Sequence, residues 1–272
     1  MKNRKLISQR HPALYFIAVW LRRIKRTFEW YFDHKKYAKT KQTDELLYNV
    51  KKHQSLLIRK LGDGNDFLQL NKITNLKIAL SKLNGVLIKP GETLSFCKVV
   101  GLPTKRKGYV LGMELSFGKA RAGIGGGICQ IANMMHWLAL HSELEITQRS
   151  NHSFDPFPDE GRTLPFGSGA AIFYNYVDLQ LTNRTKKTFQ LNLWITEKHL
   201  EGTLKTNEPT NTSYHVFEKK HRFLKINDTF YRENEIWRNC IDKKTGNIIK
   251  TELIKKNFAR VTYIPENFTE SF

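Results

Sequence analysis

A cysteine follows directly on the most glycine-rich stretch of the chain. Gly125, Gly126 and Gly127 precede Ile128 and Cys129, and apolar residues at helical spacing come next. At the N-terminal end of a helix, backbone N–H groups and the helix dipole favour an anion, which lowers the pKa of a thiol and makes it nucleophilic. Glycines let a substrate approach the backbone and leave N–H groups for an oxyanion hole. The stretch predicts a nucleophilic cysteine or a ligand-binding loop.

A nucleophilic thiol needs a base, and His152 is the candidate for that role. It follows one predicted helix and one predicted strand, at the start of a long loop. Asp155, Asp159 and Asp178 could orient the imidazole, and the sequence does not choose among them. The alternative is that Cys129 is a small buried hydrophobic residue and that the glycines serve close backbone packing. Both interpretations stay open at this point.

Other chemistries fit the sequence less well. A dinucleotide-binding fingerprint needs a third glycine where Ile128 stands, so nucleotide binding is not expected. Cys129, His136 and His152 would supply three metal ligands, but a structural zinc site needs four, and no CxxC pair is present. Three cysteines are too few for a disulfide framework. We therefore expect no metal and no cofactor.

Positive charge is concentrated at the start of the chain. The 272 residues carry a net charge of +20, and residues 1–60, with 16 Lys/Arg against 4 Asp/Glu, hold +12 of it. This distribution predicts a basic helical arm at 1–60. Residues 12–32 mix aromatic side chains with arginine, so residues 1–40 either contact an anionic membrane or dock on the domain with a solvated basic face. No nucleic-acid-binding motif accompanies the charge, so nucleic acid is not the expected partner.

The N-terminal residues do not resemble an export signal. Nine apolar residues, 13–21, follow the basic start, and Arg22 and Arg23 then interrupt them. A membrane span needs about 20 apolar residues, and no small-residue cleavage site follows. We expect a cytoplasmic protein, and the two alternatives for residues 1–40 leave open whether it is also peripheral to the inner face of the membrane.

The hydrophobic pattern predicts an α+β fold, with mixed strands packed around the helix that starts at Cys129. A main domain at 70–200 and a small β-rich appendage at 213–265 are separated by a polar break at 207–213. Helices are expected at 71–84 and from 129 to 141–142. Strands are expected at 93–100, 109–116, 144–150, 170–183, 188–196, 201–206, 214–226, 229–241 and 248–264.

Five sequence blocks together resemble the VanW family. They are KPGETLSF (89–96), VVG (99–101), GIGGGICQIANMMHWLAL (123–140), EITQRSNH (145–152) and VDLQLTN (177–183). Their order and spacing match the family over roughly residues 70–195. The resemblance implies a cell-envelope setting connected with glycopeptide resistance. It carries no established reaction.

The resemblance and the local chemistry together give the candidate site. The catalytic candidates are Cys129 and His152, and the binding candidates are Glu92, Gly125, Gly126, Gly127, Gln130 and Asp178. Where many family members carry an aspartate, this chain has Gly169, which weakens the case for a catalytic triad. The expected function is binding of a peptidoglycan precursor or peptide. The alternative is a thiol-dependent hydrolase or acyl/peptidyl transferase that uses Cys129 and His152.

Overall fold

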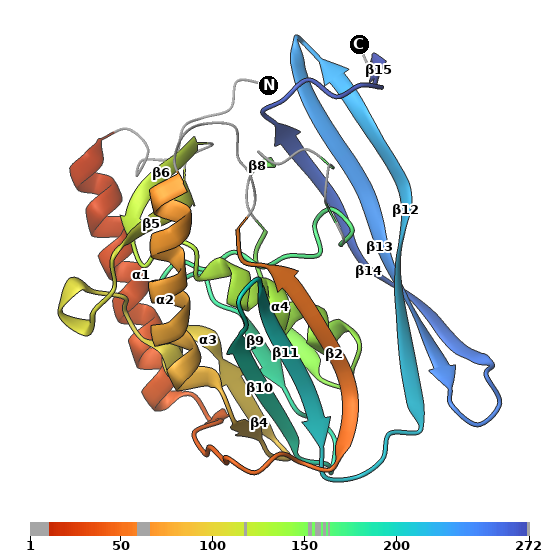
Figure 1. The fold of residues 1–272 in the computed structure, drawn as a ribbon. Coiled ribbons are helices and arrows are strands. Elements are labelled where there is room, and N and C mark those ends of the chain that lie inside the picture. The colour runs from red at the N-terminus through yellow and green to blue at the C-terminus, as the bar shows by residue number, and fades with distance from the viewer. Residues whose placement is uncertain are drawn as a thin grey trace.

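Four helices and a series of strands form an α+β fold in the computed structural model, which describes residues 11–58, 66–116, 119–151, 154–155, 159, 162 and 164–270 (Figure 1). The α+β class predicted from the sequence is confirmed. The predicted division at 1–60, 70–200 and 213–265 stays a prediction.

The main sheet carries most of the hydrophobic core. Its antiparallel strands follow the order β2 (Tyr48–Leu56), β11 (His199–Thr206), β10 (Phe189–Ile195) and β3 (Val86–Ile88). Helix α2 (Asp66–Leu83) and helix α4 (Cys129–Leu140) pack on it. A Cβ added at Gly202 of β11 would lie 3.1 Å from Met134 Cγ, so the glycine allows α4 to approach the sheet closely. The core therefore forms between these two helices and the sheet.

Helix α4 starts at Cys129, as predicted, and is buried on nearly every side. Residues 131–140 are all buried except Asn133. A helix that is covered on every side needs apolar or hydrogen-bonded residues all round, and the sequence supplies them. Helix α4 is thus the central element of the fold.

A second sheet lies beside the first. Its strands follow the order β1 (Lys36–Tyr37), β4 (Glu92–Ser95), β9 (Gln180–Thr182) and β7 (Glu145–Gln148). The strand expected at 93–100 is wrong in its second half, because the chain turns into helix α3 (Phe96–Val100). The strand expected at 170–183 is regular only in β9.

Asp178 explains why helix α3 begins where it does. The side chain of Ser95 accepts the Lys98 N–H at 3.1 Å as an N-cap, and its hydroxyl donates to Asp178 Oδ2 at 2.6 Å. Asp178 Oδ1 also accepts the Cys97 N–H at 2.8 Å. A fully buried carboxylate thus supports the first turn of α3 from 81 and 83 residues away.

The hairpin of β5 (Leu111–Ser116) and β6 (Lys119–Ile124) packs on α2 and was expected from the sequence. The sequence FGK (117–119) predicts the turn of this hairpin; residues 117–118 lie outside the described residues, and Lys119 is already the first residue of β6. A short 3-10 turn, η2 (Lys105–Lys107), precedes the hairpin.

The C-terminal residues form a long ribbon that runs past one side of the main body (Figure 1). Its strands follow the order β15 (Thr269–Glu270), β12 (Thr212–Ile226), β13 (Thr229–Asp242), β14 (Ile248–Val261) and β8 (Phe154–Asp155). The three long strands were expected, whereas β8 comes from the loop after β7 and pairs parallel with β14. Trp137 and Leu140 of α4 form an apolar cluster with Val216 and Ile236 of the ribbon. The ribbon is therefore packed on the main body.

The N-terminal segment is helical only in part. Helix α1 (Pro12–Phe32) has proline at its start, and His11 Nδ1 accepts the Ala13 N–H at 3.2 Å. The helical character expected for residues 1–60 is wrong beyond α1, because β1 and β2 follow α1 and β2 forms an edge of the main sheet. Among the described residues, no helix combines the length and apolar character needed to cross a membrane.

Removing the Asp178 carboxylate should destabilise the protein strongly. Asp178→Ala leaves the Ser95 hydroxyl and the Cys97 N–H without their partner in a buried place, so the free energy of unfolding should fall by about 3 kcal/mol. Ser95→Ala should lower it by about 1 kcal/mol through loss of the N-cap. Because the two residues share contacts, the double variant should lose less than the sum, as measured by urea unfolding. The exposed Asp44→Ala is the control, and strict additivity would contradict the shared role.

Candidate functional site

A cavity of about 550 Å³ opens where the main body meets α1 and the C-terminal ribbon. The glycines before α4 and the first residues of that helix form one wall. Other walls come from α1 through Arg23, from the end of β2, and from α2 through Gln69 and Lys72. Further lining segments are 101–103, 154–155, 164–169, 172–174 and 257–259. Elements from the whole length of the chain thus build this one site.

The three glycines hold a tight backbone arrangement. Gly125 and Gly127 have φ angles of +80° and +94°, which side chains other than glycine rarely adopt. A Cβ at Gly126 would lie 2.2 Å from the backbone of Gly112. The N–H groups of Gly125 and Gly126 donate to the carbonyls of Val110 and Gly123, each at 3.0 Å. These two N–H groups are therefore engaged in the fold, in contrast to the oxyanion role expected from the sequence.

Asn75 of α2 holds the glycine loop in place, and the sequence motifs gave no sign of it. Its side chain is fully buried. Its Nδ2 donates to Gly126 O at 2.9 Å and Val110 O at 3.1 Å, while its Oδ1 accepts the Val110 N–H at 2.9 Å. One carboxamide thus fixes the loop before α4 against the strand that follows Val110.

Cys129 lies at the start of α4 and lines the cavity. Its thiol donates to Ile172 O at 3.8 Å. Burial raises the pKa of this thiol above its usual value, and the charge of Glu114 raises it further. The helix position therefore does not produce the lowered pKa that the sequence predicted, because desolvation of the thiolate outweighs the favourable helix terminus.

Of the other predicted site residues, Gln130 lines the cavity, whereas Glu92 and Asp178 lie elsewhere. His152 lies outside the described residues, so its pairing with Cys129 stays a prediction. Gln130 lines the cavity, and its Nε2 donates to Ser55 Oγ at 2.9 Å and Leu56 O at 2.8 Å. Glu92 accepts the Lys89 N–H at 2.9 Å in the turn before β4, and Asp178 supports α3. Neither Glu92 nor Asp178 is among the described residues that line the cavity.

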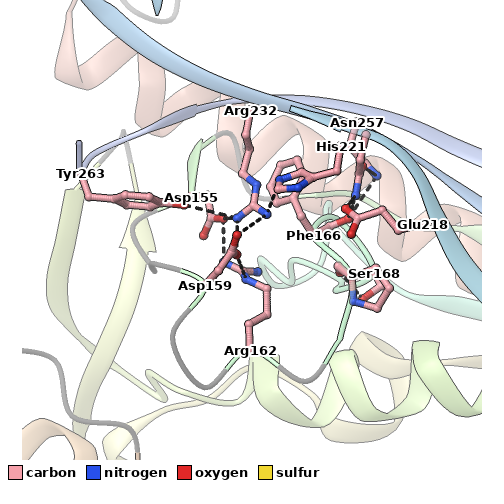
Figure 2. A network of polar contacts seen from close by, with 12 residues as sticks. Asp155, Asp159, Arg162, Phe166, Ser168, Glu218, His221, Arg232, Asn257 and Tyr263 are labelled. Atoms are coloured by element: carbon pink, nitrogen blue, oxygen red, sulfur yellow. Dashed lines mark hydrogen bonds and ion pairs between the residues drawn. The ribbon is translucent and has the colours of Figure 1, made fainter. Parts of the chain in front are cut away.

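A buried ionic network ties the loop after β7 to the ribbon (Figure 2). Arg232 of β13, only 1% exposed, donates to Asp155 at 3.0 Å and to Asp159 at 2.8 Å. It also contacts His221 Nε2 at 2.9 Å, and Arg162 binds Asp155 at 2.7 Å. Burial alone would raise the pKa of Asp159, but the hydrogen bond to Arg232 and the charges of Arg232 and Arg162 together outweigh burial, so the pKa is lowered. Asp155 and Asp159, proposed to orient His152, thus also bind arginines.

A chain of carboxamides continues this connection. Asn151 Nδ2 donates to Asn257 Oδ1 at 2.8 Å, and Asn257 Nδ2 donates to Asn234 Oδ1 at 2.8 Å. Asn234 in turn donates to Phe166 O at 2.7 Å. Asn234 and Asn257 face each other across β13 and β14, so strand register brings them together. Sequence reasoning missed them, although two buried-pattern asparagines in otherwise alternating strands were a possible signal.

Gly169 marks the departure from the family pattern, and Asn133 occupies the space beside it. A Cβ at Gly169 would lie 2.7 Å from Asn133 Oδ1. That oxygen accepts the Ala170 N–H at 2.7 Å. Arg149 donates to Gly169 O at 2.8 Å and fixes the same segment. A side-chain amide from α4 therefore lies where an aspartate at position 169 would begin.

Known proteins match most of the chain. The family described as VanW like protein matches residues 71–205. The vancomycin B-type resistance protein VanW of Enterococcus faecalis is 30% identical over 270 residues, which is 97% of each chain. This chain belongs to the VanW family. The uncharacterized protein YoaR of Bacillus subtilis is 30% identical over 116 residues, covering 42% of this chain and 38% of that protein. No solved structure matches.

The residues matched by the VanW family model form part of the cavity wall, and other wall residues lie outside that span. Residues 71–205 include the glycine loop, Cys129 and Asn133. The ribbon residues that close the cavity, such as Asn257, lie beyond that span but within the alignment to the E. faecalis relative, which covers nearly the whole chain. In the parts of the chain with described structure, no group of three His, Cys, Asp or Glu residues forms a metal site.

His136 is buried against the cavity wall. Its Nδ1 lies 2.7 Å from Ser168 O, and burial lowers its pKa to about 3, with the charge of Arg149 lowering it as well. The side chain is therefore neutral at pH 7, with Nδ1–H donating to the carbonyl. It serves to hold the segment that contains Ser168.

Cys129 should be alkylated slowly in the folded protein. Because its pKa is raised, iodoacetamide should label it more slowly at pH 7 than the same cysteine in urea-unfolded protein. Mass spectrometry of the labelled peptides measures both rates. Faster labelling in the folded state would show an activated thiol and support the catalytic alternative.

The stability of the protein should fall as the pH is lowered below 6.5. The unfolded chain binds a proton at His136 with a pKa of 6.5, whereas the folded chain resists protonation down to about pH 3. In that interval this group should lower the free energy of unfolding by up to about 1.4 kcal/mol per pH unit. His136→Gln should give a shallower pH dependence in urea unfolding, and the exposed His34→Gln should leave it unchanged. An unaltered slope in His136→Gln would contradict this origin.

Proposed function

We propose that the chain is a binding protein whose cavity holds the peptide part of a cell-envelope precursor. Support comes from three carboxamide side chains in the cavity wall, Gln130, Asn133 and Asn151. Each uses one end of its amide group to hold the fold. The opposite ends bond no residue in the described part of the chain.

The available groups match the polar pattern of a peptide backbone. Gln130 Oε1 and Asn151 Oδ1 are acceptors for N–H groups, and Asn133 Nδ2 is a donor for a carbonyl. Because the fold already fixes the other end of each amide, little side-chain freedom is lost when a ligand binds. The site is therefore preorganised for a neutral, amide-rich ligand.

The rest of the lining suits the side chains of such a ligand. Pro103, Ile124, Phe166, Phe173 and Tyr174 supply apolar surface. The cavity volume of about 550 Å³ lies in the usual range for small-molecule and short-peptide sites. An ionic ligand would have to compete with existing ion pairs, because the wall residues Arg162 and Asp155 bind each other and Glu114 binds Arg121.

The family relationship supplies the setting of the proposal. The E. faecalis relative is named as a vancomycin B-type resistance protein. We extend an envelope context to this chain on that basis, and a peptidoglycan precursor with its stem peptide combines that context with the amide-rich lining. The ligand class therefore rests on the cavity chemistry and the relative together.

The competing function is a thiol-dependent hydrolase or acyl/peptidyl transferase that uses Cys129 and His152. Two features count against it. The pKa of Cys129 is raised by burial, and the N–H groups of Gly125 and Gly126 are already bonded. Cys129→Ser tests it directly, because an enzyme of this kind would lose all turnover, whereas ligand affinity should stay within about twofold since a hydroxyl replaces the thiol.

Reversing one hydrogen-bonding group in the cavity should weaken binding. Asn133→Asp keeps an oxygen for the Ala170 N–H but replaces the Nδ2 donor by a charged acceptor. Calorimetric titration with a soluble muropeptide should show affinity reduced at least about tenfold, or 1.4 kcal/mol, because a ligand carbonyl then faces a carboxylate.

The control for this variant is Asn239→Asp, which lies in the ribbon outside the cavity wall. It should bind the muropeptide as the unmodified protein does. Equal affinity in Asn133→Asp and Asn239→Asp, with folding intact, would contradict a peptide site in this cavity.

A further inference from the structure

Helix α1 exposes most of its large apolar side chains, which is the opposite of what a surface helix of a soluble protein does. Its more covered positions are Tyr15, Ala18, Val19, Arg23, Arg26, Glu29 and Trp30. Its exposed large hydrophobic residues, between 40% and 76% exposed, are Leu14, Phe16, Ile17, Trp20, Leu21, Ile24, Phe28, Tyr31 and Phe32. A surface helix normally turns its apolar side to the core. Here that side is exposed instead.

The covered side of α1 is held by polar contacts. Arg23 Nε donates to Tyr174 O at 2.9 Å, and Asn175 Nδ2 donates to Arg23 O at 3.3 Å. Lys98 Nζ donates to Trp30 O at 2.8 Å. The Trp30 ring also packs against the Tyr174 ring, with centroids 6.1 Å apart. These contacts fix which side of the helix is exposed.

The exposed side forms one continuous surface, the apolar stripe. At 100° per residue, all its members except Phe16 fall within an arc of roughly 120° around the helix axis. Neighbours along it touch, since the rings of Phe28 and Phe32 stack at 5.6 Å and those of Phe16 and Trp20 meet edge-on at 6.2 Å. A contiguous exposed apolar surface of this kind marks an interaction site. Figure 1 shows α1 along the outer edge of the molecule.

We propose that the apolar stripe lies in the surface of an anionic lipid bilayer, with α1 parallel to the membrane plane. Basic side chains lie beside it, because Lys25 is next to the stripe on α1 and Lys35 and Lys36 follow the end of the helix. Trp20 and Tyr31 are the residue types that favour the membrane interface. Their combination with a net charge of +12 in residues 1–60 matches anionic headgroups. A helix of 21 residues would lie along the surface for about 31 Å.

A second copy of the chain fits this surface less well. Each copy carries a net charge of +20, and both copies would bring the same basic border of the stripe together. Like charges of this density repel, whereas an anionic bilayer attracts them. Charge complementarity therefore selects the membrane, and this choice does not depend on the ligand proposed for the cavity.

The test is co-sedimentation of the full chain with vesicles. The protein should bind phosphatidylcholine vesicles that contain about 30% phosphatidylglycerol, bind pure phosphatidylcholine weakly, and lose binding as salt is raised. Leu21→Ser, Ile24→Ser and Phe28→Ser together should reduce the partition coefficient at least about tenfold, because they remove three apolar side chains that the bilayer would bury. Circular dichroism verifies that this variant stays folded.

A matched control removes three other exposed apolar residues. Ile248→Ser, Ile249→Ser and Leu253→Ser lie on β14 and should leave vesicle binding unchanged. Equal loss in both triple variants, or no binding to anionic vesicles by the unmodified chain, would overturn the proposal. Concentration-dependent dimerisation that only the α1 triple variant abolishes, without vesicle binding, would assign the surface to a second copy.

The depth of insertion gives a second readout. Lipids brominated on their acyl chains should quench the fluorescence of Trp20, and the quenching should be lost in Trp20→Phe. Trp137, which is 8% exposed in the second apolar cluster, should not be quenched. Quenching that persists in Trp20→Phe would place another part of the protein at the membrane and overturn this orientation.

Discussion

The carboxamide of Asn75 binds two backbone segments at once, and the candidate site depends on it. It holds the carbonyl of Gly126 and both backbone polar groups of Val110. A buried group with three hydrogen bonds is costly to displace, because each freed donor or acceptor would be unsatisfied. The glycine loop therefore has one position, and helix α4 starts from it. The place of Cys129 in the cavity follows from a residue on a different helix.

The cavity is equally dependent on the C-terminal ribbon. Arg232 and the asparagine pair Asn234 and Asn257 lie on ribbon strands, but their partners lie in the loop after β7. Buried charges are tolerated only when they are paired, so this interface favours one arrangement over others of similar area. The ribbon thus acts as a wall of the site as well as a separate layer of the fold.

Local patterns in the sequence were sufficient to predict many of the helices and strands. The helix expected at 71–84 is observed at Asp66–Leu83, and the helix at Cys129 and the three long ribbon strands were also expected, because periodicity and turn residues determine such elements. Helix α3 was missed, since its cap depends on Asp178, far along the chain. Strand β2 was missed because its charged residues follow a solvent-facing pattern in a basic segment.

The candidate site was predictable only where a single segment carries it. The glycines, Cys129 and Gln130 were found because they are consecutive in the sequence. The pKa of Cys129 was predicted in the wrong direction, since helix position can be deduced from sequence but burial by Ile172 and its neighbours cannot. Asn75, Asn133 and Asn257 were not found, because their importance arises from partners brought together by folding.

Arg23 has a consequence for how a ligand reaches the protein. It belongs to the covered side of α1 and also lines the cavity, so the apolar stripe and the cavity lie on opposite sides of one helix. A helix with its side chains is about 10–12 Å across. A protein held on a bilayer by the stripe would keep its cavity within about that distance of the lipid headgroups. Ligand capture would then become a search in two dimensions, in which a lipid-linked molecule is met by lateral diffusion and a soluble one has no such advantage.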